Sequence, residues 1–132
     1  MTTTKNISYE VIEGNIHQIT LHNNTRQTVD DLFVQTTKIN ALATPDETML
    51  YLFDSTTVND LPFRYVIQLA EKWKKEQVFL PPACNAILYG TNTFMRYMVN
   101  MLVDVSKKSG AESQIFHPDN RNEAISWLQS KS

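Results

Sequence analysis

The stretch MLYLFDST at residues 49–56 decides the fold of this chain. Its first five residues are apolar, which is too short a run for an ordinary helix and is typical of a strand buried on both faces. A polar loop follows, and a helical pattern opens at Leu61 and Pro62. This order of buried strand, polar loop and helix predicts an α/β domain, and open α/β sheets bind ligands at the carboxyl ends of their strands.

Length and composition indicate one globular domain that spans residues 1–132, with a disordered start over residues 1–6. A net charge of −2 provides no basic field for a nucleic-acid backbone, so we expect no nucleic-acid partner. The single cysteine, Cys84, excludes an intrachain disulfide and suits a reducing compartment. We recognise neither a signal peptide nor an apolar run long enough to span a bilayer, and therefore expect a cytoplasmic protein without a transmembrane segment.

The segment before the central strand predicts a hairpin and a helix. Apolar residues alternate with polar ones over residues 7–11 and 17–21, and the turn residues 13–15 (EGN) lie between them. The T-x-x-D pattern of Thr28 and Asp31 then resembles a capping box, so we expect the first helix to begin there. Apolar residues at helical spacing continue to Ile39.

The segment after the central strand alternates helices with strands. We expect a helix over residues 62–75, a buried strand over 85–89, a helix over 94–107 and a short edge strand over 113–116. A last helix begins near Asn120. The order is β-β-α-β-α-β-α-β-α, which predicts an α/β fold with an N-terminal β-hairpin and a mixed sheet with helices packed on it.

Catalytic patterns are absent from the sequence. No HExxH, CxxC, GxSxG or glycine-rich phosphate loop occurs, and His17 and His22 lie five residues apart, so they would face opposite sides of a strand. Cys84 borders a buried strand, where an inert packed thiol is the simpler interpretation. We therefore expect no enzyme activity, no metal and no cofactor.

Polar residues at the predicted strand ends form a first candidate ligand site. If the strands are parallel, their loops meet at one edge, and the helix that begins near residue 93 would offer free N–H groups to a polar head group. The alternative, more common for these residue types, is that they cap helices and close turns. The candidate residues are Asp54, Ser55, Thr56, Thr91 and Asn92.

The predicted helix over residues 94–107 is more apolar than one sheet-facing stripe requires, because nine of the twelve residues 94–105 are apolar. Burial under the last helix and Trp127 explains part of this surface, and the rest indicates an apolar small molecule or lipid, a protein partner, a homodimer or a membrane. The candidate apolar contacts are Phe63, Ile67, Phe94, Met95, Met98, Met101 and Leu102.

A second apolar and basic segment lies at the end of the helix over residues 62–75. Aromatic and lysine side chains beside a short apolar loop are typical of interfacial membrane binding, although a solvated helix end has the same composition. The candidate membrane contacts are Trp73, Lys74, Lys75, Phe79 and Leu80.

The element order, the LFD ending of the central strand (residues 52–54) and the closing NEAISWL of residues 122–128 resemble the SpoIIAA-like family, part of the STAS superfamily. That family is similar to the CRAL-TRIO lipid-binding fold, so the resemblance implies an apolar ligand and association with membranes. STAS domains of the anti-anti-sigma type instead bind a partner protein and are switched by a phosphorylated serine. The corresponding helix start here, residues 59–63 (NDLPF), contains no serine.

Together these features predict a non-enzymatic domain that binds an apolar or amphipathic, lipid-like ligand, in the cytoplasm and at the inner membrane surface. The ligand would lie between the helices over residues 62–75 and 94–107, with its head group at the polar strand ends. The alternative is a STAS-type protein-interaction module, a regulator that lacks the usual phosphorylatable serine.

Overall fold

A computed structural model describes residues 2–44, 46–58, 60–77, 81–89 and 111–131 of the chain. The predicted helix over residues 94–107 lies outside these residues. The elements that the structure describes are β1 (Thr2–Thr3), β2 (Ile7–Ile12), β3 (Ile16–Leu21), α1 (Arg26–Asn40), β4 (Met49–Asp54), α2 (Phe63–Glu76), β5 (Ala83–Leu88), β6 (Glu112–Phe116), the short 3-10 helix η1 (Pro118–Asn120) and α4 (Arg121–Gln129).

The strands form one mixed sheet in the order β1-β2-β3-β4-β5-β6. The first three strands pair antiparallel, and β3, β4, β5 and β6 run parallel to one another. The predicted α/β fold with an N-terminal hairpin and a mixed sheet is confirmed. The parallel part brings the carboxyl ends of β4, β5 and β6 to the same edge of the sheet.

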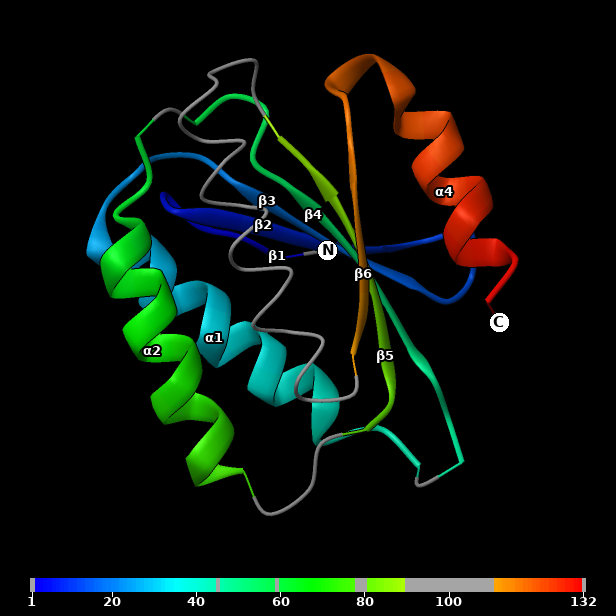
Figure 1. The fold of residues 1–132 in the computed structure, drawn as a ribbon, viewed down its shortest axis with the longest axis horizontal. Helices are drawn as coiled ribbons and strands as arrows, with labels where there is room; N and C mark the ends of the chain where they lie inside the picture. The colour runs from blue at the N-terminus through cyan, green and yellow to red at the C-terminus, as the bar shows by residue number, and fades with distance from the viewer. Residues whose placement is uncertain (1, 45, 59, 78–80, 90–110, 132) are drawn as a thin grey trace.

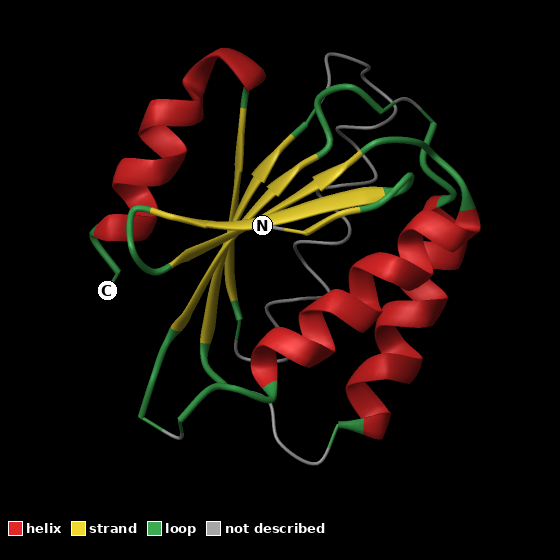
Figure 2. Cartoon of the chain, turned by 180° about the vertical axis from the view of Figure 1, so that it is seen from behind, coloured by secondary structure: helices red, strands yellow, loops and turns green. Residues whose placement is uncertain are grey.

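Helices cover both faces of this sheet. Figure 1 shows α1 and α2 side by side on one face and α4 on the opposite face, and the view from behind in Figure 2 shows the same division. We call these the α1/α2 face and the α4 face. The helices α1 and α2 also pack directly against each other.

Strand β4 lies in the middle of the parallel part and supplies both faces with buried side chains. Leu50 and Leu52 point into the α4 face, where they pack with Ala124 and Leu128. Met49 and Tyr51 point into the α1/α2 face, where they pack with Ile39 of α1 and other apolar residues. A strand that is buried on both faces must be apolar throughout, which explains the run at residues 49–53.

The N-terminal hairpin has the predicted strands and turn. Strands β2 and β3 pair from Ile7 with Leu21 to Ile12 with Ile16. The turn places Glu13 and Gly14 at positive φ values of 51° and 84°. This reversal needs the left-handed region, which glycine enters without steric cost.

Two features of the N-terminal half differ from the sequence prediction. Residues 1–6 were predicted to be disordered, whereas Thr2 and Thr3 extend the sheet as β1, because the backbone of β2 offers them an open edge. The first helix begins one turn before Thr28. Thr25 is its N-cap and accepts a hydrogen bond from the Thr28 N–H at 3.2 Å, so the capping pattern is T-x-x-T.

The last helix docks as predicted. Ala124 and Leu128 of α4 are buried, and Trp127 lies against Phe116 of the edge strand β6 at 5.9 Å between ring centroids. Asn120 is the predicted N-cap residue, but its side chain makes no capping hydrogen bond. The preceding turn is instead organised by His117, whose Nδ1 accepts from the Asp119 N–H at 3.2 Å.

Truncation of the central strand tests this description of the core. We expect Leu52→Ala to lower the free energy of unfolding by about 2–5 kcal/mol, because Leu52 is fully buried and a cavity would remain. The matched control is Leu42→Ala, since Leu42 is 84% exposed and its truncation should change stability by about 0.5 kcal/mol or less. Urea denaturation measures both, and equal effects would contradict the assignment of β4 to the core.

Candidate functional site

A cavity of about 430 Å³ lies between α1, α2 and the sheet. The part of the sheet below it belongs to the parallel strands β4, β5 and β6 and to Leu21 at the end of β3. Apolar side chains dominate its described walls, which also carry a few polar groups. The described residues that line it include Leu32, Phe33, Asn40, Tyr51, Phe53, Ser55, Phe63, Val66, Ala70, Trp73, Lys74, Asn85, Ile87 and Ser113.

The floor of the cavity consists of rows of side chains set by the strand register. Tyr51, Asn85 and Ser113 lie in one row, since Tyr51 pairs with Asn85 and Asn85 with Ser113. Two residues further along each strand, Phe53 and Ile87 form the next row on the same face. The floor therefore carries one polar row in the first half of the parallel strands, after the apolar Ala83, and an apolar row beyond it, with Ser55 following the end of β4.

The helices α1 and α2 form the walls of the cavity, and both run from the carboxyl ends of the parallel strands toward their beginnings. Both begin after the carboxyl end of a strand and end before the beginning of the next parallel strand. Phe63 and Val66 near the start of α2 are buried, and Phe63 packs against Ile87 of β5. Asn40 ends α1, and Lys74 lies in the last turn of α2, so both belong to the polar end of the cavity.

Contacts between the helices hold this polar end together. The Trp73 indole N–H donates to the Thr37 hydroxyl at 2.7 Å, and the Trp73 ring lies 5.7 Å from the ring of Phe33. The Tyr51 hydroxyl donates to the side-chain oxygen of Asn40. On the floor, the Asn85 amide donates to the Ser113 hydroxyl at 3.2 Å. Polar groups from five different elements thus meet at one end of a mainly apolar cavity.

The predicted polar site at the carboxyl ends of the strands is divided between the two faces. Asp54 lies on the α4 face, and its carboxylate accepts hydrogen bonds from the N–H (3.0 Å) and hydroxyl (2.7 Å) of Thr56. Ser55 lies on the other face, is buried, and donates its hydroxyl to the Leu88 carbonyl at 2.8 Å. Neither Asp54 nor Thr56 lines the cavity. These bonds are those of a closed turn, the alternative that the sequence left open.

Arg121 is a second contact of Asp54 that sequence reasoning missed. Its guanidinium lies 4.0 Å from the Asp54 carboxylate and donates to the side chain of Gln18. The residue begins α4, so these contacts join the helix to the middle of β3 and the end of β4 on the α4 face. A partly exposed pair of this kind orients a helix more than it stabilises one.

The apolar candidates divide between described residues and residues outside them. Phe63 lines the cavity, whereas Ile67 is partly exposed and is not among its described lining residues. The candidates that lie outside the described residues are Thr91, Asn92, Phe94, Met95, Met98, Met101, Leu102, Phe79 and Leu80.

The described membrane-contact candidates have different environments. Trp73 is held between the two helices by the contacts given above, and Lys74 lines the cavity. Lys75 is exposed. The described membrane-contact candidates therefore do not form one surface. Trp73 lies in a helix contact, Lys74 in a cavity wall and Lys75 on the solvent-facing side of α2.

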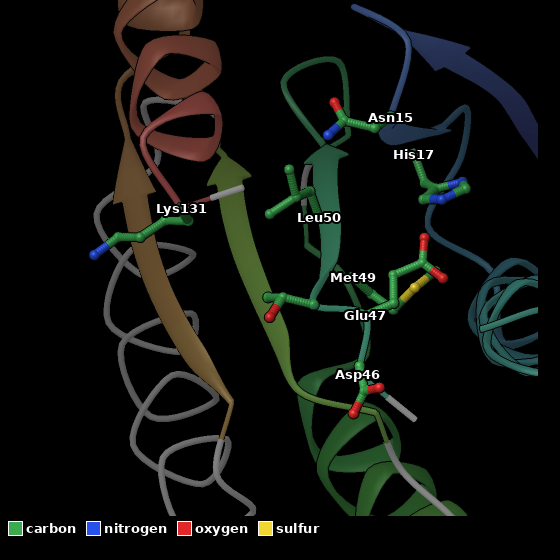
Figure 3. A pocket seen from close by; sticks show the side chains of 8 residues that line it. Asn15, His17, Asp46, Glu47, Met49, Leu50 and Lys131 are labelled. Atoms are coloured by element: carbon green, nitrogen blue, oxygen red, sulfur yellow. The ribbon is translucent and has the colours of Figure 1, made fainter. Parts of the chain in front are cut away.

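A second pocket, of about 280 Å³, lies where β3 and β4 begin. Figure 3 shows the side chains of His17 and Glu47 pointing toward each other across it, and Lys131 pointing away. Lys131 pairs instead with Glu112, at 3.0 Å. The pocket is polar, and Asp46 and Glu47 at its rim are exposed to solvent.

His17 lines this second pocket, and its pKa is shifted by its surroundings. Its ring is stacked on Tyr9 at 5.9 Å and lies 5.8 Å from the ring of Tyr51, while its Nδ1 contacts the Tyr9 hydroxyl at 2.7 Å. Burial lowers the pKa of His17 below its ordinary value, and the nearby carboxylate of Glu47 acts in the opposite direction. Burial also raises the pKa of Tyr51.

The remaining candidates for reactivity are the thiol of Cys84 and any cluster of metal-binding side chains. Cys84 is buried in the α4 face, and burial raises the pKa of its thiol. The described residues hold no group of three or more His, Cys, Asp or Glu side chains arranged to bind a metal ion.

The polar row of the cavity floor was missed by sequence reasoning. Asn85 opens the predicted apolar strand over residues 85–89, and a polar amide there was a signal that one side of the strand meets something polar. Its alignment with Tyr51 and Ser113 depends on strand register, which the sequence does not state.

Comparison of the chain with family models, with curated proteins and with solved structures finds no match. The resemblance to the SpoIIAA-like family therefore stays a prediction. Among the described residues, no helix combines the length and the apolar character needed to cross a bilayer.

A proton titration tests the environment of His17. Because burial favours the neutral ring, NMR titration should give His17 a midpoint below 6.5, the ordinary value. Neutral His17 stabilises the fold above pH 6.5, and this contribution should be lost as pH falls through 6.5 toward the lowered pKa. Accordingly, between pH 6.5 and the lowered pKa, the free energy of unfolding of the His17→Gln variant should depend less on pH than that of the unmodified chain.

Removal of the opposing charge provides the control. Glu47→Gln should move the His17 midpoint lower still, and Glu123→Gln, on the distant helix α4, should leave it in place. A midpoint at or above 6.5 in the unmodified chain would contradict the burial of this ring.

Proposed function

We propose that this domain is a non-enzymatic binding module for an apolar or amphipathic, lipid-like molecule, which it holds in the cavity between α1, α2 and the sheet. The observation that carries the proposal is the cavity itself, about 430 Å³ in volume and lined mainly by apolar side chains. Small-molecule sites commonly have volumes of roughly 300–1,000 Å³, with apolar walls and a few polar groups that orient the ligand.

The packing of the two faces supports this proposal. On the α4 face, Leu52, Ala86 and Leu128 are completely buried against one another. On the other face, α2 packs against α1, and its buried side chains are confined to Phe63 and Val66 near its start. The cavity extends along α2 from Phe63 to Lys74, and its mainly apolar walls favour an apolar occupant.

The hydrogen bonds around the cavity support binding without catalysis. The Ser55 hydroxyl is bonded to a backbone carbonyl, and Cys84 lies on the opposite face of the sheet. A serine or cysteine nucleophile needs a base within hydrogen-bond reach, and the partner of Ser55 is a carbonyl rather than a base. The Cys84 thiol lies 4.0 Å from the Glu112 carboxylate, but burial and that carboxylate both raise the thiol pKa, which disfavours the reactive thiolate.

No observation in the described part of the chain favours the protein-interaction alternative. Its docking surface would involve the helix over residues 94–107, which lies outside that part. Ser55 follows the central strand and is the serine that could be compared with the phosphorylated serine of STAS domains. It is 5% exposed, and its hydroxyl is bonded to the Leu88 carbonyl.

We further propose that the domain works in the cytoplasm and touches membranes peripherally while it exchanges ligand. A free, buried cysteine suits a reducing compartment, and Lys75 is exposed at the end of α2. Flotation with neutral and with anionic liposomes tests this part, and recovery of protein in neither liposome fraction would contradict it.

Native mass spectrometry of the purified protein, followed by organic extraction, tests the binding function directly. We expect a population with an added mass that solvent extraction removes and identifies as an amphipathic molecule. Protein that carries no such molecule, and that also takes none up from added fatty acid or fatty alcohol, would contradict the proposal.

A substitution that fills the cavity should abolish binding. Ala70 lines the cavity from α2, so Ala70→Phe places a ring in the space of the ligand and should weaken binding at least tenfold. Gln68→Phe is the control, because Gln68 is exposed on the same helix and the same ring there should leave affinity unchanged. Titration by isothermal calorimetry measures both, and equal affinities would place the ligand elsewhere.

A further inference from the structure

The cavity has a direction, because the charged side chain among its described lining residues and most of the polar ones lie at one end. The polar lining residues elsewhere, Thr36 and Ser55, donate their hydroxyls to backbone carbonyls. Tyr51, Asn85 and Ser113 form the floor there, Asn40 ends one wall, and Lys74 lies in the last turn of the other. From the Tyr51 row to Ser55 near the other end, four residues of β4 extend roughly 13 Å at about 3.3 Å per residue. The row next to Tyr51, formed by Phe53 and Ile87, is apolar.

Lys74 gives this polar end a charge. Among the described residues that line the cavity, Lys74 alone carries a formal charge. No carboxylate of the described part of the chain forms a salt bridge with it, although Lys72 on the same helix pairs with Glu76 at 3.9 Å. Lys74 is partly exposed as a residue, and an anionic group of a ligand in the cavity would pair with its ammonium group.

The neighbouring polar groups offer donors to the same anion. The Asn40 side-chain oxygen is occupied by the Tyr51 hydroxyl, which leaves its amide N–H groups as donors. The Ser113 hydroxyl accepts from Asn85 and keeps its own proton to donate. An acidic head group accepts from donors of this kind, whereas a cationic one would meet Lys74 unfavourably.

We propose that the ligand is a single-chain amphiphile with an anionic head group, a carboxylate or a phosphate, bound beside Lys74 where the parallel strands begin. Its chain runs between α2 and the sheet toward Phe63 and Val66. The head group is thus at the opposite end from the strand ends that the sequence suggested. This inference rests on the proposed function, because it names the class of molecule that the same cavity takes.

The test compares ligands that share a chain and differ in the head group. Dodecanoate, dodecyl phosphate and dodecanol are titrated into the full chain carrying Trp127→Phe, so that Trp73 in the cavity wall is the remaining tryptophan reporter. We expect dodecanoate or dodecyl phosphate to bind at least tenfold more tightly than dodecanol. The more tightly bound of the two anions identifies the head group.

Matched lysine variants assign the preference to one residue. Lys74→Met should remove most of the difference between anion and alcohol, while Lys72→Met, which changes an exposed lysine of the same helix, should keep it. Asn85→Asp provides a second variant, because a carboxylate on the floor repels the two anions and should weaken their binding more than that of dodecanol.

Each outcome decides a different statement. Equal affinity for the alcohol and both anions overturns the anionic head group. A preference that survives Lys74→Met overturns the placement of the head group beside Lys74. Both results leave the proposed binding function standing. Failure of all three ligands to bind contradicts the binding function and this inference together.

Discussion

The alternation of side chains along β4 is the constraint on which the rest of the structure depends. Successive residues of a strand point to opposite faces, so Leu50 and Leu52 fill one side of the sheet while Tyr51 and Phe53 face the other. Helix α4 covers the first side with a closed apolar core. On the second side, α1 and α2 pack against each other, and a cavity lies between the two helices and the strands. The α4 face therefore contains a closely packed core, and the α1/α2 face contains the cavity.

Much of the fold follows from local patterns in the sequence. The period of two in β2 and β3, the turn at Gly14 and the apolar run of β4 each act through neighbouring residues, and their structures agree with the predictions. The start of α1 was misplaced because two threonines three residues apart, Thr25 and Thr28, both suit a cap. Choosing between them requires the tertiary contacts of Thr28, which is buried.

The site was less predictable because it depends on contacts between distant segments. The rule that α/β sheets bind ligands at their carboxyl edge indicated Asp54, Ser55 and Thr56. In the structure, alternation turns Asp54 toward Arg121 and buries the Ser55 hydroxyl against the Leu88 carbonyl. Ser55 does line the cavity, but the polar row of its floor, Tyr51, Asn85 and Ser113, is assembled by the register of three strands. No local pattern reveals such an alignment, although a polar Asn85 in an apolar strand hints at it.

The central claim is that the two faces of the sheet divide stability from binding, and methyl NMR during titration with dodecanoate tests it most directly. The account predicts shifts at the methyl groups of Leu32, Val66 and Ile87, which border or line the cavity. The methyl groups of Leu52 and Leu128, in the core of the α4 face, should stay in place. Shifts spread equally over both faces, or confined to the α4 face, would contradict this division.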